Sequence, residues 1–194
     1  MQHIEPYYKW RDYYVAAEDK KSPFYKRQYS EFYYTHTIYN YYIHPQWDEF
    51  GSTTLYLKML FVDYEQQLAI IEFLGEWNDC IENDVMTLKR DVIDHLLRLG
   101  IYKFILIGEN VFNFHADDEC YYEEWYENVT DKDGWVAMLN VRDHVLDEMT
   151  TASVHLYLNM GQHLNNIAWR TLTPSHVLAT VEQALNRNTR QLGA

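Results

Sequence analysis

The side chains with the greatest chemical potential stand just beyond runs of apolar residues that predict strands. They are Glu76 and Asn78, then Glu109, Asn110 and His115, then Asn140 and Arg142, and last Asn159. In open α/β sheets, ligands bind outside the carboxyl ends of the strands, so these residues predict a polar pocket. There Glu76 or Glu109 would act as a base or cation ligand, the asparagines would orient a ligand, and Arg142 would pair with an anion. Asparagine also caps helices and completes turns, which is the alternative explanation, above all for Asn78 and Asn140.

The run from His115 to Cys120 (HADDEC) brings ligand-type side chains close together in the sequence. A metal site would need two or three of them to converge, and the carboxylates would favour magnesium, calcium or manganese. The same acids would stand in the first turn of a helix, where the helix dipole stabilises negative charge. Because acidic first turns are common, we predict no metal ion and no other cofactor.

An aromatic and acidic helix is expected over residues 117–128. Its candidate interaction face, which would suit a basic protein partner, comprises Tyr121, Glu124, Trp125 and Tyr126. The alternative is a helix whose aromatic residues, with Tyr122 and Trp125 among them, join the core while its acids face solvent. Exposure of Tyr121 and Tyr126 distinguishes the two.

The short signatures of several enzyme classes are absent from the chain. It contains no GxGxxG, GxxxxGK[ST], GxSxG or HExxH sequence and no Cys or His pair at zinc-finger spacing. These absences disfavour dinucleotide oxidoreductases, P-loop enzymes, serine hydrolases and the common zinc enzymes. The absences do not exclude an enzyme whose active site has no short sequence motif.

Charge and composition narrow the range of partners. The 194 residues carry a net charge of −13, which disfavours nucleic acid and anionic membrane surfaces, and nine of the acids lie between Glu109 and Asp133. No apolar run reaches the roughly 20 residues that cross a bilayer, and residues 1–10 lack the pattern of a signal peptide. Cys80 and Cys120 do not suggest a disulfide framework. A cytoplasmic protein with a protein partner or a small-molecule ligand is therefore expected.

The elements that would position these residues alternate in type along the chain. Strands are expected, from alternating or continuous apolar patterns, over residues 54–62, 68–74, 101–107, 135–140 and 154–158. Helices are expected over residues 79–99, 117–128, 142–151 and 174–190. The first two strands predict a hairpin, and the rest follow the rhythm of βαβ crossovers. The expected fold is a three-layer α/β domain, with a mixed sheet that has a parallel βαβ core and an antiparallel hairpin edge.

The first 52 residues differ from the rest in their aromatic content, since eleven of the eighteen tyrosines lie between Tyr7 and Tyr42. Such a segment can cover apolar surface while its hydroxyl groups keep polar partners, and residues 33–43 alternate as a strand does. Because a segment of this size alone would form a marginal core, we expect residues 1–52 to pack on residues 53–194 as one domain. The aromatic residues from Tyr7 to Tyr14 also suit a homodimer interface.

A hairpin followed by βαβαβα over residues 53–158 resembles the architecture of anti-sigma-factor antagonist (STAS) and SpoIIAA-like domains. The resemblance rests on element order and implies a regulatory domain. Phosphorylated STAS regulators carry a serine or threonine just after the strand that corresponds to residues 101–107. Gly108, Glu109 and Asn110 stand there instead, so regulation of that kind is not expected. The phrases YNYYIHPQW (residues 39–47) and YYEEW (residues 121–125) resemble those of an uncharacterised bacterial family, which implies no activity.

Two classes of function are compatible with these features. The first is a non-enzymatic, STAS-like binding or regulatory module that uses the acidic, aromatic helix or the strand-end pocket. The second is a small-molecule enzyme without a short motif, with Glu109, His115 and Arg142 at the carboxyl ends of the parallel strands. A deep pocket lined by those three residues would favour the enzyme, and an exposed patch around residues 121–127 would favour the module.

Overall fold

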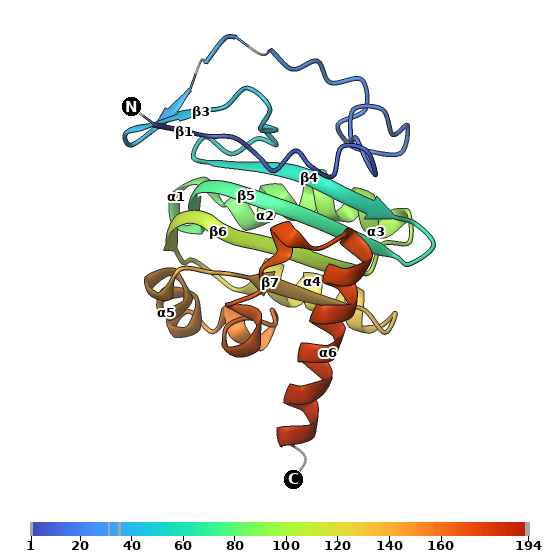
Figure 1. The fold of residues 1–194 in the computed structure, drawn as a ribbon. Helices are drawn as coiled ribbons and strands as arrows, with labels where there is room; N and C mark the ends of the chain where they lie inside the picture. The colour runs from blue at the N-terminus through green and yellow to red at the C-terminus, as the bar shows by residue number, and fades with distance from the viewer. Residues whose placement is uncertain (1, 31, 35, 193–194) are drawn as a thin grey trace.

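A four-stranded sheet forms the centre of the molecule (Figure 1). The computed structural model describes residues 2–30, 32–34 and 36–192, and within these ranges it describes the side chains of residues 4–187. The strands of the sheet are, in spatial order, β4 (Leu55–Asp63), β5 (Leu68–Asn78), β6 (Lys103–His115) and β7 (Trp135–Leu139). β4 pairs antiparallel with β5, whereas β5, β6 and β7 are parallel. The expected mixed sheet with a hairpin edge and a parallel core is confirmed.

Helices cover both faces of the sheet, so the molecule has three layers (Figure 1). One face carries α1 (Asp79–Glu82), α2 (Asp84–Leu88), α3 (Asp94–Arg98), α4 (Cys120–Thr130) and α5 (Asp143–Thr151). The opposite face carries α6 (Pro174–Leu192) and part of the N-terminal segment. We call these the α4 face and the α6 face. Within the described residues, none of the helices has the length and apolar character needed to cross a bilayer.

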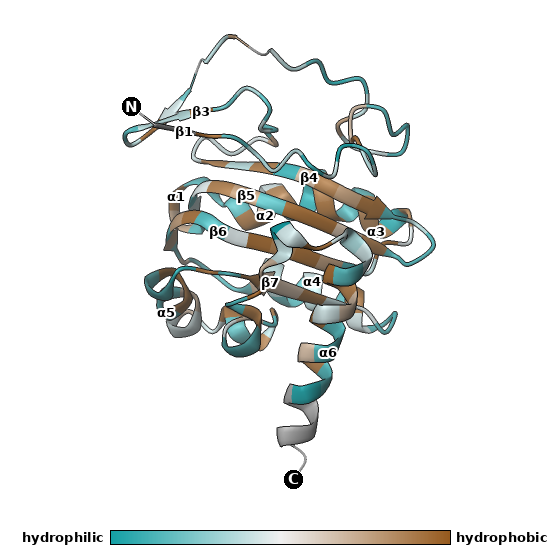
Figure 2. Ribbon diagram, viewed as in Figure 1, coloured by the Kyte–Doolittle hydropathy of each residue, from teal (hydrophilic) through white to brown (hydrophobic). Residues whose placement is uncertain are grey.

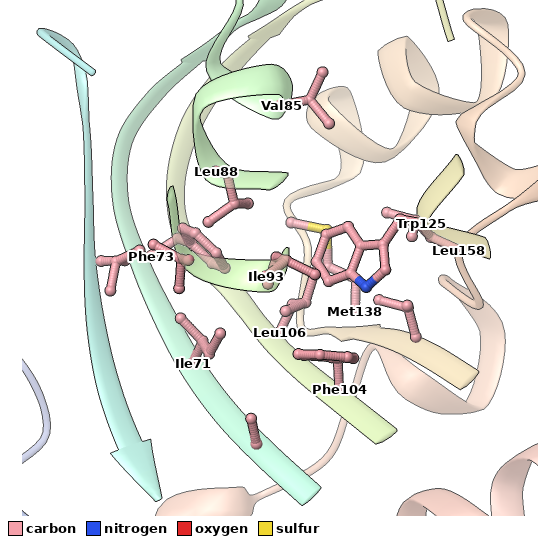
Figure 3. Close-up of a cluster of buried hydrophobic side chains, with 14 of the residues drawn as sticks. Ile71, Phe73, Val85, Leu88, Ile93, Phe104, Leu106, Trp125, Met138 and Leu158 are labelled. Atoms are coloured by element: carbon pink, nitrogen blue, oxygen red, sulfur yellow. The ribbon is translucent and has the colours of Figure 1, made fainter. Parts of the chain in front are cut away.

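Alternate residues of the strands divide the core between the two faces. On β5, Ala69, Ile71 and Phe73 pack on the α4 face, whereas Leu68 and Ile70 pack on the α6 face. All five are completely buried, which explains the almost continuous apolar sequence of this strand. Figure 2 shows the hydrophobic character (brown) concentrated along the central strands, and Figure 3 shows the buried cluster on the α4 face.

Two strands run further than their apolar patterns predict, and one helix starts later. β5 continues past residue 74 to Asn78, β6 continues past residue 107 to His115, and α4 begins at Cys120 and not at residue 117. Polar residues such as Glu109 interrupt the apolar pattern of β6 without ending the strand. Register shifts between β5 and β6 absorb the irregularity, so that the two strands stay paired as far as His115.

Residues 79–99 form a helical layer, as expected, but the helix is interrupted. Asn78 caps the first turn, because its side chain accepts a hydrogen bond from the Ile81 N–H at 3.0 Å. Asn83 then adopts a left-handed conformation, with a φ of 52°, and separates α1 from α2. Asparagine tolerates this conformation better than most residues, since its short polar side chain can hydrogen-bond locally. A π-helical turn (Lys89–Ile93) lies between α2 and α3.

The expected strand over residues 154–158 is wrong. This stretch begins with a 3-10 helix (Val154–Leu156), and the chain reaches the sheet only at Asn159, which makes an isolated parallel bridge with Ala137 of β7. A short apolar run does not distinguish a helical turn from a strand, which is why its pattern was misleading. Two more 3-10 helices precede α6, at Gln162–Leu164 and Trp169–Thr171.

The N-terminal segment forms a second, smaller sheet. β1 (Gln2–Ile4) pairs parallel with β3 (Tyr41–Ile43), and β3 pairs antiparallel with β2 (Thr37–Ile38). The expected single strand over residues 33–43 is therefore wrong, because Tyr39, with a φ of 52°, turns the chain between β2 and β3. Thr35, which belonged to that expected strand, lies outside the described residues.

Between β1 and β2 the chain wraps around β4, the edge strand of the main sheet. Trp10 packs in the core of the α6 face, whereas Ala16 and Phe24 pack in the core of the α4 face. The wrap protects an edge that would otherwise offer unpaired backbone groups to other chains. Tyr8 and Tyr13 are left exposed, so the homodimer interface expected near Tyr7–Tyr14 stays a prediction.

Candidate functional site

The residues expected to form one strand-end pocket lie at different levels of the sheet. Because β6 continues to His115, Glu109 and His115 stand on the same extended strand with roughly 20 Å between their backbones. β7 ends at Leu139, opposite Ile107, so Asn140 lies near the Glu109 level. The sheet therefore divides the candidates into smaller groups.

Three candidates are engaged in local hydrogen bonds. Glu76 accepts a bond from the Asn113 side-chain amide at 3.2 Å. Asn78 caps α1, as described above. The side-chain amide of Asn159 donates to the Val136 carbonyl at 2.9 Å, beside the edge of β7. These are the capping and edge contacts that polar residues commonly make next to regular elements.

Asn140 joins the end of β7 to the segment that precedes α6. Its side-chain amide donates to the Ile167 carbonyl at 2.9 Å, and its side-chain oxygen accepts from the Ile167 N–H at 3.1 Å. Asn165 makes the same pair of bonds in the other direction, with the backbone of Val141, at 2.9 and 2.8 Å. Two side-chain amides thus fix the segment that carries Trp169 and Arg170.

We expect Asn140→Ala to lower the free energy of unfolding by about 1–3 kcal/mol. The substitution removes two hydrogen bonds worth about 0.5–1.5 kcal/mol each and leaves alanine at a left-handed φ of 54°. Urea unfolding measures the change. Asn166→Ala, at an exposed neighbouring position, is the control and should cost under about 0.5 kcal/mol. Unchanged stability of Asn140→Ala would favour a ligand-binding role over this structural one.

Glu109 and Asn140 line one open hollow of about 260 Å³, together with Trp169 and Arg170. Arg142 lies next to it, where its Nε donates to the Glu109 backbone carbonyl at 3.1 Å. The strand ends therefore bring Glu109, Asn140 and Arg142 near one another. His115 does not join them.

A buried carboxylate, Glu72, adjoins this hollow. It stands on β5 with a completely buried side chain. One oxygen accepts the Tyr7 backbone N–H at 2.9 Å, and the other lies 3.3 Å from Arg170 and 3.5 Å from the Asn110 side-chain amide. Arg170 also forms an ion pair with Glu109. We call these five residues the Glu72 cluster. One guanidinium in it joins carboxylates from two neighbouring strands.

Burial raises the pKa of Glu72 to about 7, although the hydrogen bond from Tyr7 and the charge of Arg170 act in the opposite direction. A carboxyl group that titrates near neutral pH is suited to proton transfer. However, the Tyr7 backbone and Arg170 occupy its oxygens, and the side chain has no exposed surface. In this structure the Glu72 cluster ties the N-terminal segment to β5, β6 and the 3-10 helix before α6.

His115 lines a separate open hollow of about 540 Å³ with Cys80, Asp147 and Glu148. The neighbouring Asp118 is engaged at the start of α4, where it accepts the Cys120 backbone N–H at 2.8 Å. Across the described part of the chain, no group of three or more His, Cys, Asp or Glu side chains is arranged to hold a metal ion.

The residues of α4 divide between core and solvent. Trp125 is completely buried, so it supports the helix from inside and contributes nothing to an exposed face. Tyr126 is 41% exposed, whereas Tyr121 is half-buried. Glu124 forms a bidentate pair with Arg90, with both N···O distances at 2.7 Å. Of the four residues expected to form the interaction face, Tyr126 is the one that is both exposed and free of an ion pair.

Tyr126 has a half-buried aromatic neighbour that the sequence did not predict. The Tyr157 ring packs against it edge to face, with 6.2 Å between the centroids, and the adjacent Leu156 is 61% exposed. Partial desolvation raises the pKa of Tyr157, and three nearby carboxylates raise it further. We call this group the acidic–aromatic patch. Its members are Tyr126, Leu156 and Tyr157 with Asp118, Glu119 and Glu123.

Sequence reasoning missed Glu72 and Tyr157 for different reasons. Glu72 was visible as a single acid within the apolar run LAIIEFL, and an acid at a buried strand position is a signal in itself. Tyr157 carried no such signal, because the stretch that contains it was expected to be a strand. Arg170 lies in the segment between residue 158 and the last helix, for which no element was expected.

Comparison with known proteins gives a likeness of fold and no match in sequence. No protein-family model matches the chain, and no curated protein matches it either. The chain is similar to a crystal structure from Thermotoga maritima, that of a "putative anti-sigma factor antagonist". The alignment covers 65% of this chain and 94% of that one, with a TM-score of 0.45 and 16% sequence identity.

Proposed function

We propose that the protein is a non-enzymatic, STAS-like binding module that holds a basic protein partner against the acidic–aromatic patch. The observation that carries the proposal is the ring pair of exposed Tyr126 and half-buried Tyr157, which lies beside exposed Leu156 and is bordered by carboxylates. Exposed apolar side chains with a polar rim are typical of interaction sites. Aromatic rings attract cations, and the carboxylates would steer a lysine- or arginine-rich surface toward them.

The charges around the patch support this partner. Within the part of the chain that the structure describes, no Lys or Arg side chain forms an ion pair with Asp118, Glu119 or Glu123. Arg90 and Lys89 pair with Glu124 instead, on another side of the helix. The carboxylates near Tyr157 therefore keep their charge available for a partner. The buried Tyr122 and Trp125 hold α4 in place, so the patch is preformed.

A small-molecule enzyme has one observation in its favour, which is the raised pKa of Glu72. The arrangement around Glu109, His115 and Arg142 supports it less well, because Glu109 and His115 line separate hollows. A substrate would reach Glu72 only if Tyr7 and Arg170 moved away. We therefore place the enzyme second.

Titration of the ¹⁵N-labelled protein followed by NMR tests the binding module. The probe is a synthetic peptide of alternating lysine and leucine residues, and a glutamate–leucine peptide of the same length is the control. We expect the lysine peptide to shift resonances of residues 117–127 and 155–158, with an affinity that falls as salt is added. The double variant Tyr126→Ala/Tyr157→Ala should bind about tenfold more weakly, since two cation–π contacts of about 0.5–1 kcal/mol each are lost.

Tyr13→Ala is the matched control, because it removes a tyrosine that is 59% exposed but lies on the N-terminal segment. It should change the peptide affinity by less than about twofold. Shifts that spread over all the acidic surfaces, and that persist in Tyr126→Ala/Tyr157→Ala, would mean attraction by net charge alone. That result would overturn the proposal.

We infer that the module acts in the cytoplasm. Cys80 and Cys120 are both exposed and free. Exposed thiols of this kind are typical of reducing compartments, where disulfides are rare.

A further inference from the structure

A pocket lies where the N-terminal segment crosses the edge strand β4. Its volume is about 340 Å³, at the lower end of the range for small-molecule sites. Residues 6–18 enclose it on one side and residues 58–60 of β4 on the other. None of its lining residues belongs to α4 or to the acidic–aromatic patch, so it is a separate feature of the molecule.

Aromatic side chains held by the fold form part of its walls. Trp10 donates its indole N–H to the Leu172 carbonyl at 3.0 Å and packs edge to face on Trp169. The hydroxyl of Tyr14 donates to Asp19 at 3.1 Å, and the hydroxyl of Tyr29 donates to Asp48. Because the polar groups of these rings already have partners, what the rings offer to a ligand is chiefly flat apolar surface.

Two cationic side chains reach the same pocket, in a chain whose net charge is −13. The Lys58 ammonium group lies 3.2 Å from Asp48 and 3.8 Å from the centroid of the Tyr29 ring. Arg11 is exposed and donates to the Gln46 side chain at 3.3 Å. Among the described residues, no carboxylate forms an ion pair with Arg11.

One cation that lines the pocket has no ion-pair partner among the described residues. Lys58 pairs with the buried Asp48, which it shares with Arg27. Arg11 is then the lining cation that a ligand could match, which favours a ligand with a single negative charge. A dianion such as a phosphate monoester would bring a second charge that no cation here is left to match. Arginine is the side chain best suited to bind such an anion when it is a carboxylate, since the guanidinium group binds a carboxylate through two parallel hydrogen bonds.

We propose that this pocket binds a small organic monoanion with a flat apolar body, such as an aryl or indolyl carboxylate. Its carboxylate pairs with Arg11, and its ring packs against the walls that include Trp10 and Tyr14. The ligand would contact the N-terminal segment and β4 at once. Its binding would therefore stabilise the wrap of that segment around the sheet edge, as any ligand stabilises the state that binds it.

NMR titration of the full chain with phenylacetate and with indole-3-acetate tests the pocket. The neutral amides of the same two acids are matched controls. We expect both acids to shift the Trp10 indole N–H and the backbone resonances of residues 10–18. Each acid should bind about ten times or more tightly than its amide, because a hydrogen bond to a charged group is worth roughly a factor of ten.

Arg11→Gln should remove the preference for the acid over the amide. The side chain is exposed, so the fold should survive the change. Arg98→Gln, an exposed substitution at the end of α3, should leave the preference intact. Three results would overturn the proposal: no shifts at the pocket residues with millimolar acid, equal binding of acid and amide, or an unchanged preference in Arg11→Gln. None of these readouts involves α4, so they are independent of the peptide experiment.

Discussion

Trp125→Ala should lower the free energy of unfolding by about 3–5 kcal/mol. Trp125 has no exposed surface and packs edge to face on Phe104, with 5.3 Å between the ring centroids. Figure 3 shows its indole within the cluster on the α4 face that also holds Ile93 and Met138. The substitution would leave a cavity where α4 meets the sheet, and the surrounding side chains could fill it only in part. Denaturant unfolding, with the slope compared between variants, measures the loss.

Trp125→Phe is the matched control, because it keeps a large ring in the core. The Trp125 indole N–H is buried without a hydrogen-bond partner among the described residues. Removal of this N–H relieves a desolvation cost of about 1–3 kcal/mol, which offsets the lost packing. We therefore expect Trp125→Phe to cost less than about 1.5 kcal/mol.

Tyr126→Ala separates the two roles of α4. This neighbouring ring is 41% exposed, so its loss should change stability by about 0.5 kcal/mol and act on partner binding instead. If Trp125→Ala proved as mild as Tyr126→Ala, Trp125 would not be the residue that anchors the helix.

The central sheet was predictable because each strand carries its own signal. Apolar residues at most positions of residues 68–74 in β5 and of residues 101–107, which lead into and form the first half of β6, are typical of strands that are buried on both faces. The interruption of the helical layer at Asn83 was not predictable in the same way, because a single left-handed residue leaves the apolar spacing almost unchanged. The same holds for Tyr39, which splits an apparently continuous strand into β2 and β3.

The candidate sites depend on contacts between residues that are distant in sequence, and this limits what a pattern can predict. Glu72 meets the Tyr7 N–H across 65 positions and Arg170 across 98. The ring pair of Tyr126 and Tyr157 likewise joins a helix to a segment whose own conformation was mispredicted. Conversely, Glu109 and His115, which are close in sequence, are kept apart because β6 stays extended between them.

The stability of the protein should fall as pH rises toward 7, and Glu72→Gln should remove much of this fall. Burial raises the pKa of Glu72 to about 7 in the folded protein, from 4.5 as its ordinary value. Between these two values the folded state holds a proton that the unfolded state has released, so each rise in pH favours unfolding. Above pH 7 both states are ionised, and the full cost of about 3 kcal/mol is present.

Glutamine mimics the protonated carboxyl group and cannot ionise. At pH 5 we therefore expect Glu72→Gln to have nearly the stability of the wild type, and at pH 8 to be more stable by as much as about 3 kcal/mol. Unfolding in urea at both values measures the two differences. The difference between variant and wild type at each pH cancels the contribution of the histidines, which titrate in the same range.

Asp79→Asn distinguishes Glu72 from a second buried carboxyl group whose pKa is raised. Burial raises the pKa of Asp79 to about 6, from 3.8. The fall in stability that Asp79 causes is therefore nearly complete at pH 6, whereas Glu72 still titrates above that pH. Between pH 6 and 8, the free energy of unfolding of Asp79→Asn should therefore change with pH as that of the wild type does, whereas that of Glu72→Gln should not. If Glu72→Gln also followed the wild type there, Glu72 would be ionised throughout. The guanidinium of Arg170 would then outweigh burial, and the Glu72 cluster would hold the N-terminal segment by a fixed ion pair at every pH near neutrality.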